Sequence, residues 1–223
     1  MKLKSLAAIV AAGGLFAAAG PSSALLSCSN YPTLLLWSTS GGCVDNNDGD
    51  TTWTYTGSTL IAQGLGATRF QVIESMDAAG NDFYTLNLDY TATPGQVWVP
   101  GAGPNTLDFN VAQLLPEFLT AANFDNTVQG SGGLATATIA APASLTLTST
   151  NGSRDPAQGE TPFPGGRQSL VHVTDRWNPS PNAQYTSSNN SFTTQPIPEP
   201  VSLALVGLGL AGMGLVRRKR KLS

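Results

Sequence analysis

The stretch FYTLNLDYT, residues 83–91, shows the pattern on which the fold of this chain depends. From its second residue onward apolar and polar side chains alternate, and the apolar ones are Tyr84, Leu86, Leu88 and Tyr90. Successive side chains of a β-strand point to opposite faces, so these four residues share one face. The pattern predicts a strand that buries this face in a core.

A second alternating segment, Arg69–Met76, lies just before the first one. It places Phe70, Val72 and Met76 on one face, and the turn-forming residues AGND at 79–82 follow it. Two strands joined by such a turn predict an antiparallel hairpin.

Seven other segments have the composition or the alternation of strands. They are Thr52–Ile61, Gln96–Val99, Thr106–Val111, Leu134–Ala140, Ser144–Ser149, Ser169–Thr174 and Gln184–Phe192. Residues 151–166 are rich in Gly and Pro and predict a long loop, whereas residues 187–197 are polar and predict a linker after a body at 25–186.

The segment Val111–Phe124 follows helical spacing instead, with Pro116 in the first turn. Its apolar residues on one helical face are Leu114, Leu115, Phe118, Leu119 and Ala122. Together these patterns predict an all-β fold, a β-sandwich of jelly-roll type, with one short helix.

The composition favours an extracellular protein. Charged residues make up only 11% of the 223 residues, and the chain contains 24 Gly and 15 Pro. Between Leu25 and Ile197 four basic residues face 13 acidic ones, a net charge of −9. Because phosphate backbones repel an acidic surface, we expect no nucleic-acid partner, whereas divalent cations and polyhydroxylated sugars are compatible.

Residues 1–24 have the organisation of a signal peptide, which signal peptidase removes. Lys2 and Lys4 precede an apolar region at Leu6–Ala19, and small residues at Ser22 and Ala24 precede a cleavage site. A permanent N-terminal membrane anchor is the alternative, although the apolar region is shorter than the ~20 residues of a spanning helix.

Two cysteines, Cys28 and Cys43, follow this segment. In an exported chain they predict one disulfide that closes a short loop. Two alternatives stay open: Leu25–Cys28 is similar to a bacterial lipobox, and one cysteine could be a reactive thiol.

The apolar segment Val201–Val216 predicts a short transmembrane helix, since its four glycines would destabilise a soluble helix. A basic cluster follows and acts as a membrane stop: Arg217, Arg218, Lys219, Arg220 and Lys221. Because positive residues stay in the cytoplasm, the body is expected outside the membrane.

The tripeptide Pro198, Glu199 and Pro200 lies directly before this segment, and its prolines favour an extended stretch that a protease can bind. The order of tripeptide, glycine-rich apolar helix and basic cluster, from Pro196 to Lys221, resembles the PEP-CTERM sorting signal of Gram-negative bacteria. The resemblance implies that an exosortase, a membrane enzyme similar to a cysteine transpeptidase, recognises residues 198–200 and cleaves nearby. It also implies release or attachment at the cell surface, commonly in bacteria that make exopolysaccharide and biofilm.

Catalytic motifs are absent from the sequence. The single histidine, His172, lies in a predicted strand, where it could join Asp175 only in a triad without a nucleophile elbow. The carboxylates Glu74, Asp77, Glu117 and Glu160 are scattered, so a glycosidase pair cannot be located.

Two further groups have both a functional and a structural interpretation. Asp45, Asp48 and Asp50 gather oxygen ligands around Gly49 and could bind calcium, or they form an ordinary polar turn. Tryptophans can form a sugar-stacking platform or simply belong to the core: Trp37, Trp53, Trp98 and Trp177.

The sequence therefore predicts an exported, non-enzymatic surface or matrix protein that is anchored in the inner membrane before an exosortase processes it. Association with exopolysaccharide is the expected role, and no cofactor is required. A carbohydrate-binding or carbohydrate-active protein with the same sorting signal is the alternative. A permanently anchored protein with a calcium-stabilised ectodomain is the third hypothesis.

Overall fold

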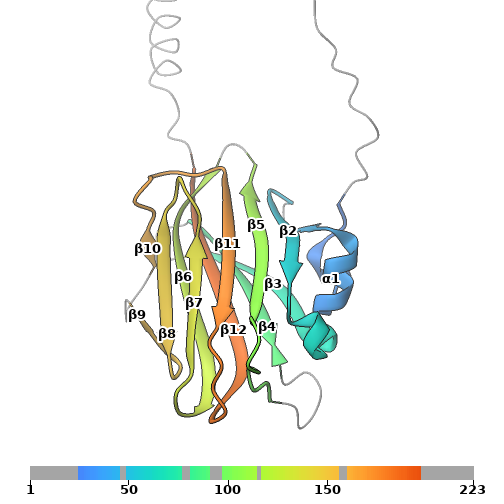
Figure 1. The fold of residues 1–223 in the computed structure, drawn as a ribbon. Coiled ribbons are helices and arrows are strands. Elements are labelled where there is room, and N and C mark those ends of the chain that lie inside the picture. The colour runs from blue at the N-terminus through green and yellow to red at the C-terminus, as the bar shows by residue number, and fades with distance from the viewer. Residues whose placement is uncertain are drawn as a thin grey trace, which may run out of the picture.

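The computed structural model describes residues 25–45, 49–76, 81–90, 97–114, 117–155 and 160–196. These residues form two antiparallel β-sheets and one short α-helix (Figure 1). The predicted all-β class and sandwich-like arrangement are confirmed, and one short helix is present, although not in the predicted segment. The jelly-roll topology stays a prediction.

The larger sheet has seven strands in the order β1-β2-β5-β11-β7-β8-β9. Their bounds are β1 Cys43–Val44, β2 Thr51–Ser58, β5 Thr106–Gln113, β7 Leu134–Ile139, β8 Leu145–Thr150, β9 Ser153–Asp155 and β11 Leu170–Trp177. The smaller sheet has five strands in the order β10-β6-β12-β4-β3. They are β3 Arg69–Met76, β4 Asp82–Asp89, β6 Glu117–Gly130, β10 Thr161–Pro162 and β12 Ala183–Pro196.

The hairpin predicted around residues 79–82 is present. β3 pairs with β4 in antiparallel register, with Phe70 opposite Leu88 and Val72 opposite Leu86. These side chains are buried, as the alternation predicts, whereas Met76 is 71% exposed. Two-residue periodicity therefore identifies both the strands and the face that enters the core.

The core lies between the two sheets and is rich in aromatic side chains. Trp37 stacks on Phe70 with ring centroids 4.4 Å apart, and Trp98 meets Trp177 edge to face at 5.2 Å. Such contacts add to the large apolar area that aromatic residues bury.

The α-helix is α1, Leu34–Ser40, and it packs Leu34 and Trp37 into the core beside β2. Thr33 caps its first turn by accepting a hydrogen bond from the Leu36 N–H at 3.4 Å. Gly41 ends it with a φ of 78°, a left-handed conformation that glycine adopts without strain. The described residues also form three single-turn 3₁₀ helices: η1 Cys28–Asn30, η2 Ile61–Gln63 and η3 Leu65–Ala67.

The predicted helix at Val111–Phe124 is wrong. Val111 belongs to β5 and Phe124 to β6, and the chain passes from one sheet to the other between them. Leu114, which the helical face would bury, is 52% exposed at this crossing. The end of β5, the crossing and the start of β6 follow one another in the sequence. Read as one segment, their apolar residues have the spacing of a helix.

The predicted linker at 187–197 is also wrong for residues 187–196, because they belong to β12. This strand lies between β4 and β6 in the middle of the smaller sheet. Its polar side chains find partners inside the sandwich: the Asn190 Nδ2 group donates to Asp175 Oδ2 at 2.6 Å, and Ser188 bonds to Asn126. The folded body therefore extends to Pro196.

Two other predictions are partly correct. Residues 151–166, predicted as a loop, contain the short strands β9 and β10. Within Gln96–Val99, predicted as a strand, only an isolated bridge between Trp98 and Tyr185 is found among the described residues. In the described ranges, no helix combines the length and the apolar character needed to cross a membrane.

Candidate functional site

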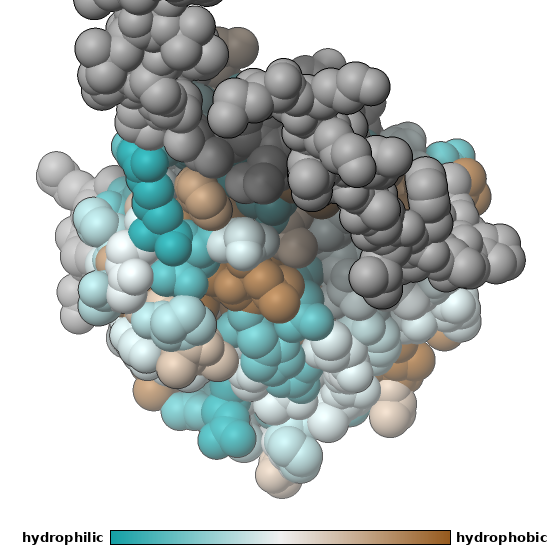
Figure 2. Space-filling view, turned by 90° about the horizontal axis from the view of Figure 1, so that it is seen from above, coloured by the Kyte–Doolittle hydropathy of each residue, from teal (hydrophilic) through white to brown (hydrophobic). Residues whose placement is uncertain are grey.

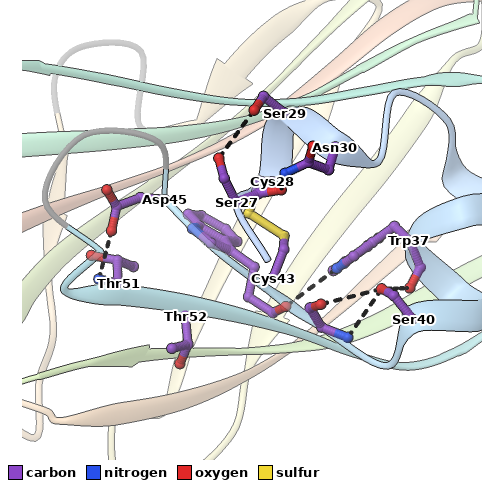
Figure 3. The surroundings of a disulfide bond; sticks show 12 residues. Ser27, Cys28, Ser29, Asn30, Trp37, Ser40, Cys43, Asp45, Thr51 and Thr52 are labelled. Atoms are coloured by element: carbon purple, nitrogen blue, oxygen red, sulfur yellow. Dashed lines mark hydrogen bonds between the residues drawn. A yellow bond between two sulfur atoms is a disulfide. The ribbon is translucent and has the colours of Figure 1, made fainter. Parts of the chain in front are cut away.

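Cys28 and Cys43 form the predicted disulfide, which ties η1 to the start of β1 (Figure 3). Their Cα atoms are 4.8 Å apart, and both residues are buried. The Val44 N–H donates to the carbonyl oxygen of Leu26 and continues this attachment. Both cysteines of the chain are thus in one bond, which corrects the lipobox and reactive-thiol alternatives.

The acidic turn after β1 is held by hydrogen bonds to its own backbone and to Tyr84 of β4. The buried carboxylate of Asp45 accepts from the N–H groups of Gly49 at 3.1 Å and Thr51 at 2.9 Å. Asp50 accepts from the Tyr84 hydroxyl at 2.8 Å. Asp48 lies outside the described residues, within which no metal-holding group of three or more His, Cys, Asp or Glu is found. Calcium at Asp45, Asp48 and Asp50 stays an untested alternative to an ordinary polar turn.

The first and last described residues lie at the same end of the sandwich, which is at the top in Figure 1. Leu26 bonds to Val44, the Leu114 N–H donates to the Asp50 carbonyl oxygen, and Pro196 pairs with Glu117. We call this end, formed by residues 25–26, 49–51, 112–114, 117 and 193–196, the exit end. Seen from above in Figure 2, it carries hydrophobic side chains among hydrophilic ones, and two exposed apolar residues there are Leu26 and Leu114.

The last three residues of β12 form a distinct unit at the exit end. A bulge between Thr193 and Thr194 shifts the register with β6, after which Thr194 pairs with Leu119 and Gln195 with Phe118. The buried Thr194 hydroxyl lies 2.6 Å from the Glu117 Oε2 atom and 3.3 Å from the Asp82 carbonyl oxygen. This side chain fastens the strand end to both neighbouring strands.

A groove of about 620 Å³ lies beside this strand end, on the outer side of the smaller sheet. Its lining combines aromatic, charged and polar side chains, including Phe83, Thr120, Glu160, Phe163, Arg167 and Gln195. A mixed lining of this kind suits a polar ligand with some apolar surface.

The same outer face carries rows of amide and hydroxyl groups. One row crosses four strands in register: Gln71, Asn87, Asn189 and Asp125. The Asn87 amide donates to Asn189 Oδ1 at 2.6 Å, and in the next row Thr85 and Ser191 share a hydrogen bond of 3.1 Å. The face is therefore rich in amide and hydroxyl groups, with the carboxylate of Asp125 among them.

His172 and Asp175 cannot form a dyad, because they lie on opposite faces of β11. His172 is on the exposed face, where its Nδ1 atom lies 2.8 Å from Asn110 Oδ1. Asp175 is buried in the core. Of the carboxylates considered for a glycosidase pair, Glu160 lines the groove, Glu117 bonds to Thr194, and Asp77 is not among the described residues.

The tryptophans belong to the core. Trp37 and Trp53 are fully buried, Trp177 is 1% exposed and Trp98 is 5% exposed. Because none presents an exposed ring face, the hypothesis of a tryptophan platform for sugars is wrong.

A buried polar network between the sheets escaped the sequence analysis. Asp175 accepts from Asn190, while the Trp177 indole N–H lies 3.1 Å from Asn126 Oδ1. Burial raises the pKa of Asp175 well above its ordinary value, the Asn190 hydrogen bond lowers it, and the charge of Asp108 raises it further. The residues of this network are distant in sequence, so only the folded structure shows that they are buried together.

The predicted sorting residues Pro198, Glu199 and Pro200, the apolar segment 201–216 and the basic residues 217–221 lie outside the described part of the chain, as do residues 1–24. A comparison with curated proteins finds no match. Residues 196–221 match the family model described as the PEP-CTERM protein-sorting motif. The match begins at the residue that ends β12, and the chain thus carries a PEP-CTERM protein-sorting motif directly after its β-sandwich.

Proposed function

We propose that this protein is an exported surface or matrix protein that an exosortase recognises and cleaves. The observation that carries the proposal is the match of residues 196–221 to the PEP-CTERM protein-sorting motif. The signal-peptide pattern of residues 1–24 and the disulfide support it, since disulfides persist in oxidising compartments outside the cytoplasm.

In this proposal the chain is anchored in the inner membrane before processing. Residues 201–216 span the bilayer, residues 217–221 stay in the cytoplasm, and the sandwich lies outside. Cleavage near Pro198–Pro200 then frees the sandwich for release or for attachment at the cell surface.

We further propose that the body associates with exopolysaccharide and has no enzymatic activity. The outer face of the smaller sheet supports this role, because amides such as those of Asn87 and Asn189 have donors and acceptors suited to sugar hydroxyls. The adjoining groove adds the ring of Phe83 and the charge of Arg167, which would suit acidic sugars. A binding face of this kind needs no cofactor.

The sorting proposal is tested by following the full chain in matched hosts with and without an exosortase. We expect a shorter mature species outside the membrane fraction in the first host and an unprocessed, membrane-bound chain in the second. Equal size and location in both hosts would disprove the proposal. The intact mass of the mature species identifies both cleavage sites.

The alternative, a carbohydrate-active enzyme, is separated by binding and hydrolysis assays on the same glycans. We expect binding without hydrolysis, weakened by Asn189→Ala and unaffected by His172→Ala on the outer face of the other sheet. Hydrolysis that disappears on removing one carboxylate, such as that of Glu160, would favour the enzyme.

A further inference from the structure

The sorting motif begins on a residue that is still part of the fold. Pro196 is the first residue of the family match and also the last residue of β12, where it pairs with Glu117 of β6. Only Ile197 separates it from Pro198. The folded sandwich therefore reaches to within two residues of the tripeptide.

The last three residues of β12 are paired differently from the rest of the strand. Pairing with β4 ends at Thr193, opposite Phe83, whereas Thr194, Gln195 and Pro196 pair only with β6. The bulge at Thr193–Thr194 separates these three residues from the regular register of residues 187–193. Bulges interrupt a ladder and mark the point where pairing changes.

The short connection to the membrane limits access to the motif. This step rests on the proposed function, in which the span begins at Val201. The four residues 197–200 reach at most about 14 Å when fully extended, which is little more than the ~10–12 Å diameter of one helix with its side chains. If residues 194–196 also leave the sheet, seven residues reach about 25 Å.

Recognition of an extended peptide also competes with the sheet. An enzyme that binds a strand-like segment uses the main-chain N–H and C=O groups of that segment. In residues 194–196 the main-chain groups that face β6 lie in the ladder with that strand. The side chain of Thr194 adds its contacts with Glu117 and Asp82.

We propose that the exosortase binding segment extends back to Thr194, and that the enzyme binds residues 194–200 only after the last three residues of β12 have separated from β6. Thr194 is then the residue that controls access, and the bulge is the point at which separation stops. Residues 187–193 of β12 stay paired with both β4 and β6, so the sandwich remains folded during processing.

The test is an engineered disulfide across the last pairs of the full chain, in a host that contains an exosortase. Gln195→Cys combined with Phe118→Cys links two directly paired positions after the bulge. The matched control, Ser191→Cys with Asn123→Cys, links a pair on the other side of the bulge. Paired Cα atoms in an antiparallel sheet lie within the range that a disulfide can bridge.

We call the disulfide of the Gln195→Cys, Phe118→Cys variant the terminal lock and that of the Ser191→Cys, Asn123→Cys variant the control lock. We expect the terminal lock to reduce the rate of processing by the exosortase at least tenfold. We expect the control lock to leave this rate within twofold of wild type. Processing of the terminal lock at the wild-type rate, or equal slowing by both locks, would overturn the proposal. Thr194→Val provides a second measurement that needs no new disulfide. We expect it to be processed at least twofold faster, and a rate at or below wild type would contradict the role of Thr194.

These outcomes are distinct from failure of the proposed function. If the wild-type chain itself is unchanged by the exosortase, the sorting assignment fails. If the wild-type chain is processed and the terminal lock is processed equally well, only the inference about β12 fails.

Discussion

Replacing Asp175 by Asn tests whether the core of this sandwich holds a carboxyl group in its neutral form. Asp175 is fully buried, its Oδ1 atom has no hydrogen-bond partner among the described residues, and its Oδ2 atom accepts from Asn190. Burial raises its pKa, which favours the protonated acid. An asparagine has nearly the same shape, keeps an oxygen for Asn190 and stays neutral at every pH.

The sign of the effect follows from proton linkage. The unfolded chain loses the proton of Asp175 near the ordinary aspartate pKa of about 3.9, whereas the folded chain keeps it to higher pH. The contribution of Asp175 to stability is complete below pH ~3.9 and declines as the pH rises, by about 1.4 kcal/mol per pH unit, until the folded-state pKa is reached. The Asn variant lacks this decline.

The assay is equilibrium denaturation of the wild type and Asp175→Asn at pH values from about 4 to about 8, followed by fluorescence of the buried tryptophans. We expect the variant to gain stability relative to the wild type by about 1.4 kcal/mol for each pH unit over the titration window. Asp125→Asn, which removes a carboxylate from the outer face, is the control. Parallel curves for the wild type and Asp175→Asn would refute the neutral buried acid.

Three other predictions concern the ends of the body and the acidic turn. Replacing Cys28 and Cys43 with Ala should lower the free energy of unfolding by about 3 kcal/mol in the chain-entropy model, given their separation of 15 residues; an unchanged denaturation midpoint would contradict this value. A chain of residues 25–196 should unfold cooperatively, whereas residues 25–186 should not fold because they lack most of β12, and circular dichroism distinguishes the two. EDTA should leave the melting temperature of the full chain unchanged, because Asp45 already bonds to backbone N–H groups; a drop would support calcium.

Local sequence patterns predicted many of the strands well. The hairpin of Arg69–Met76 and residues 82–89 follows from alternation alone, because the two-residue period is a property of the strand backbone. The disulfide was predictable because the chain has only two cysteines. The sorting motif was predictable because its order of residues is local and its match needs no folded structure.

The errors arose where distant parts of the chain decide the outcome. At Val111–Phe124 the spacing looks helical, yet the residues on either side of the crossing pair with strands from both sheets. No pattern within the segment indicates this crossing. Where the ends of two strands follow one another in the sequence, their pairing in the sheets decides the structure, and the apparent helical spacing does not.

In the candidate site, too, the local sequence suggested one structure and distant partners decided another. Ser187–Pro196 looks like a linker because its residues are mostly polar, and polar segments are usually solvated. Its polar groups are nevertheless accommodated in the core, because Asn126 and Asp175 provide hydrogen bonds from other strands.

The sequence by itself determined the two-residue period of many strands, the disulfide and the sorting motif after the body, since each depends on residues close together in the chain. Only the tertiary structure decided that β12 runs through the middle of a sheet and ends where the sorting motif begins. The physical reason is that strand pairing and the burial of polar groups depend on partners that are distant in sequence.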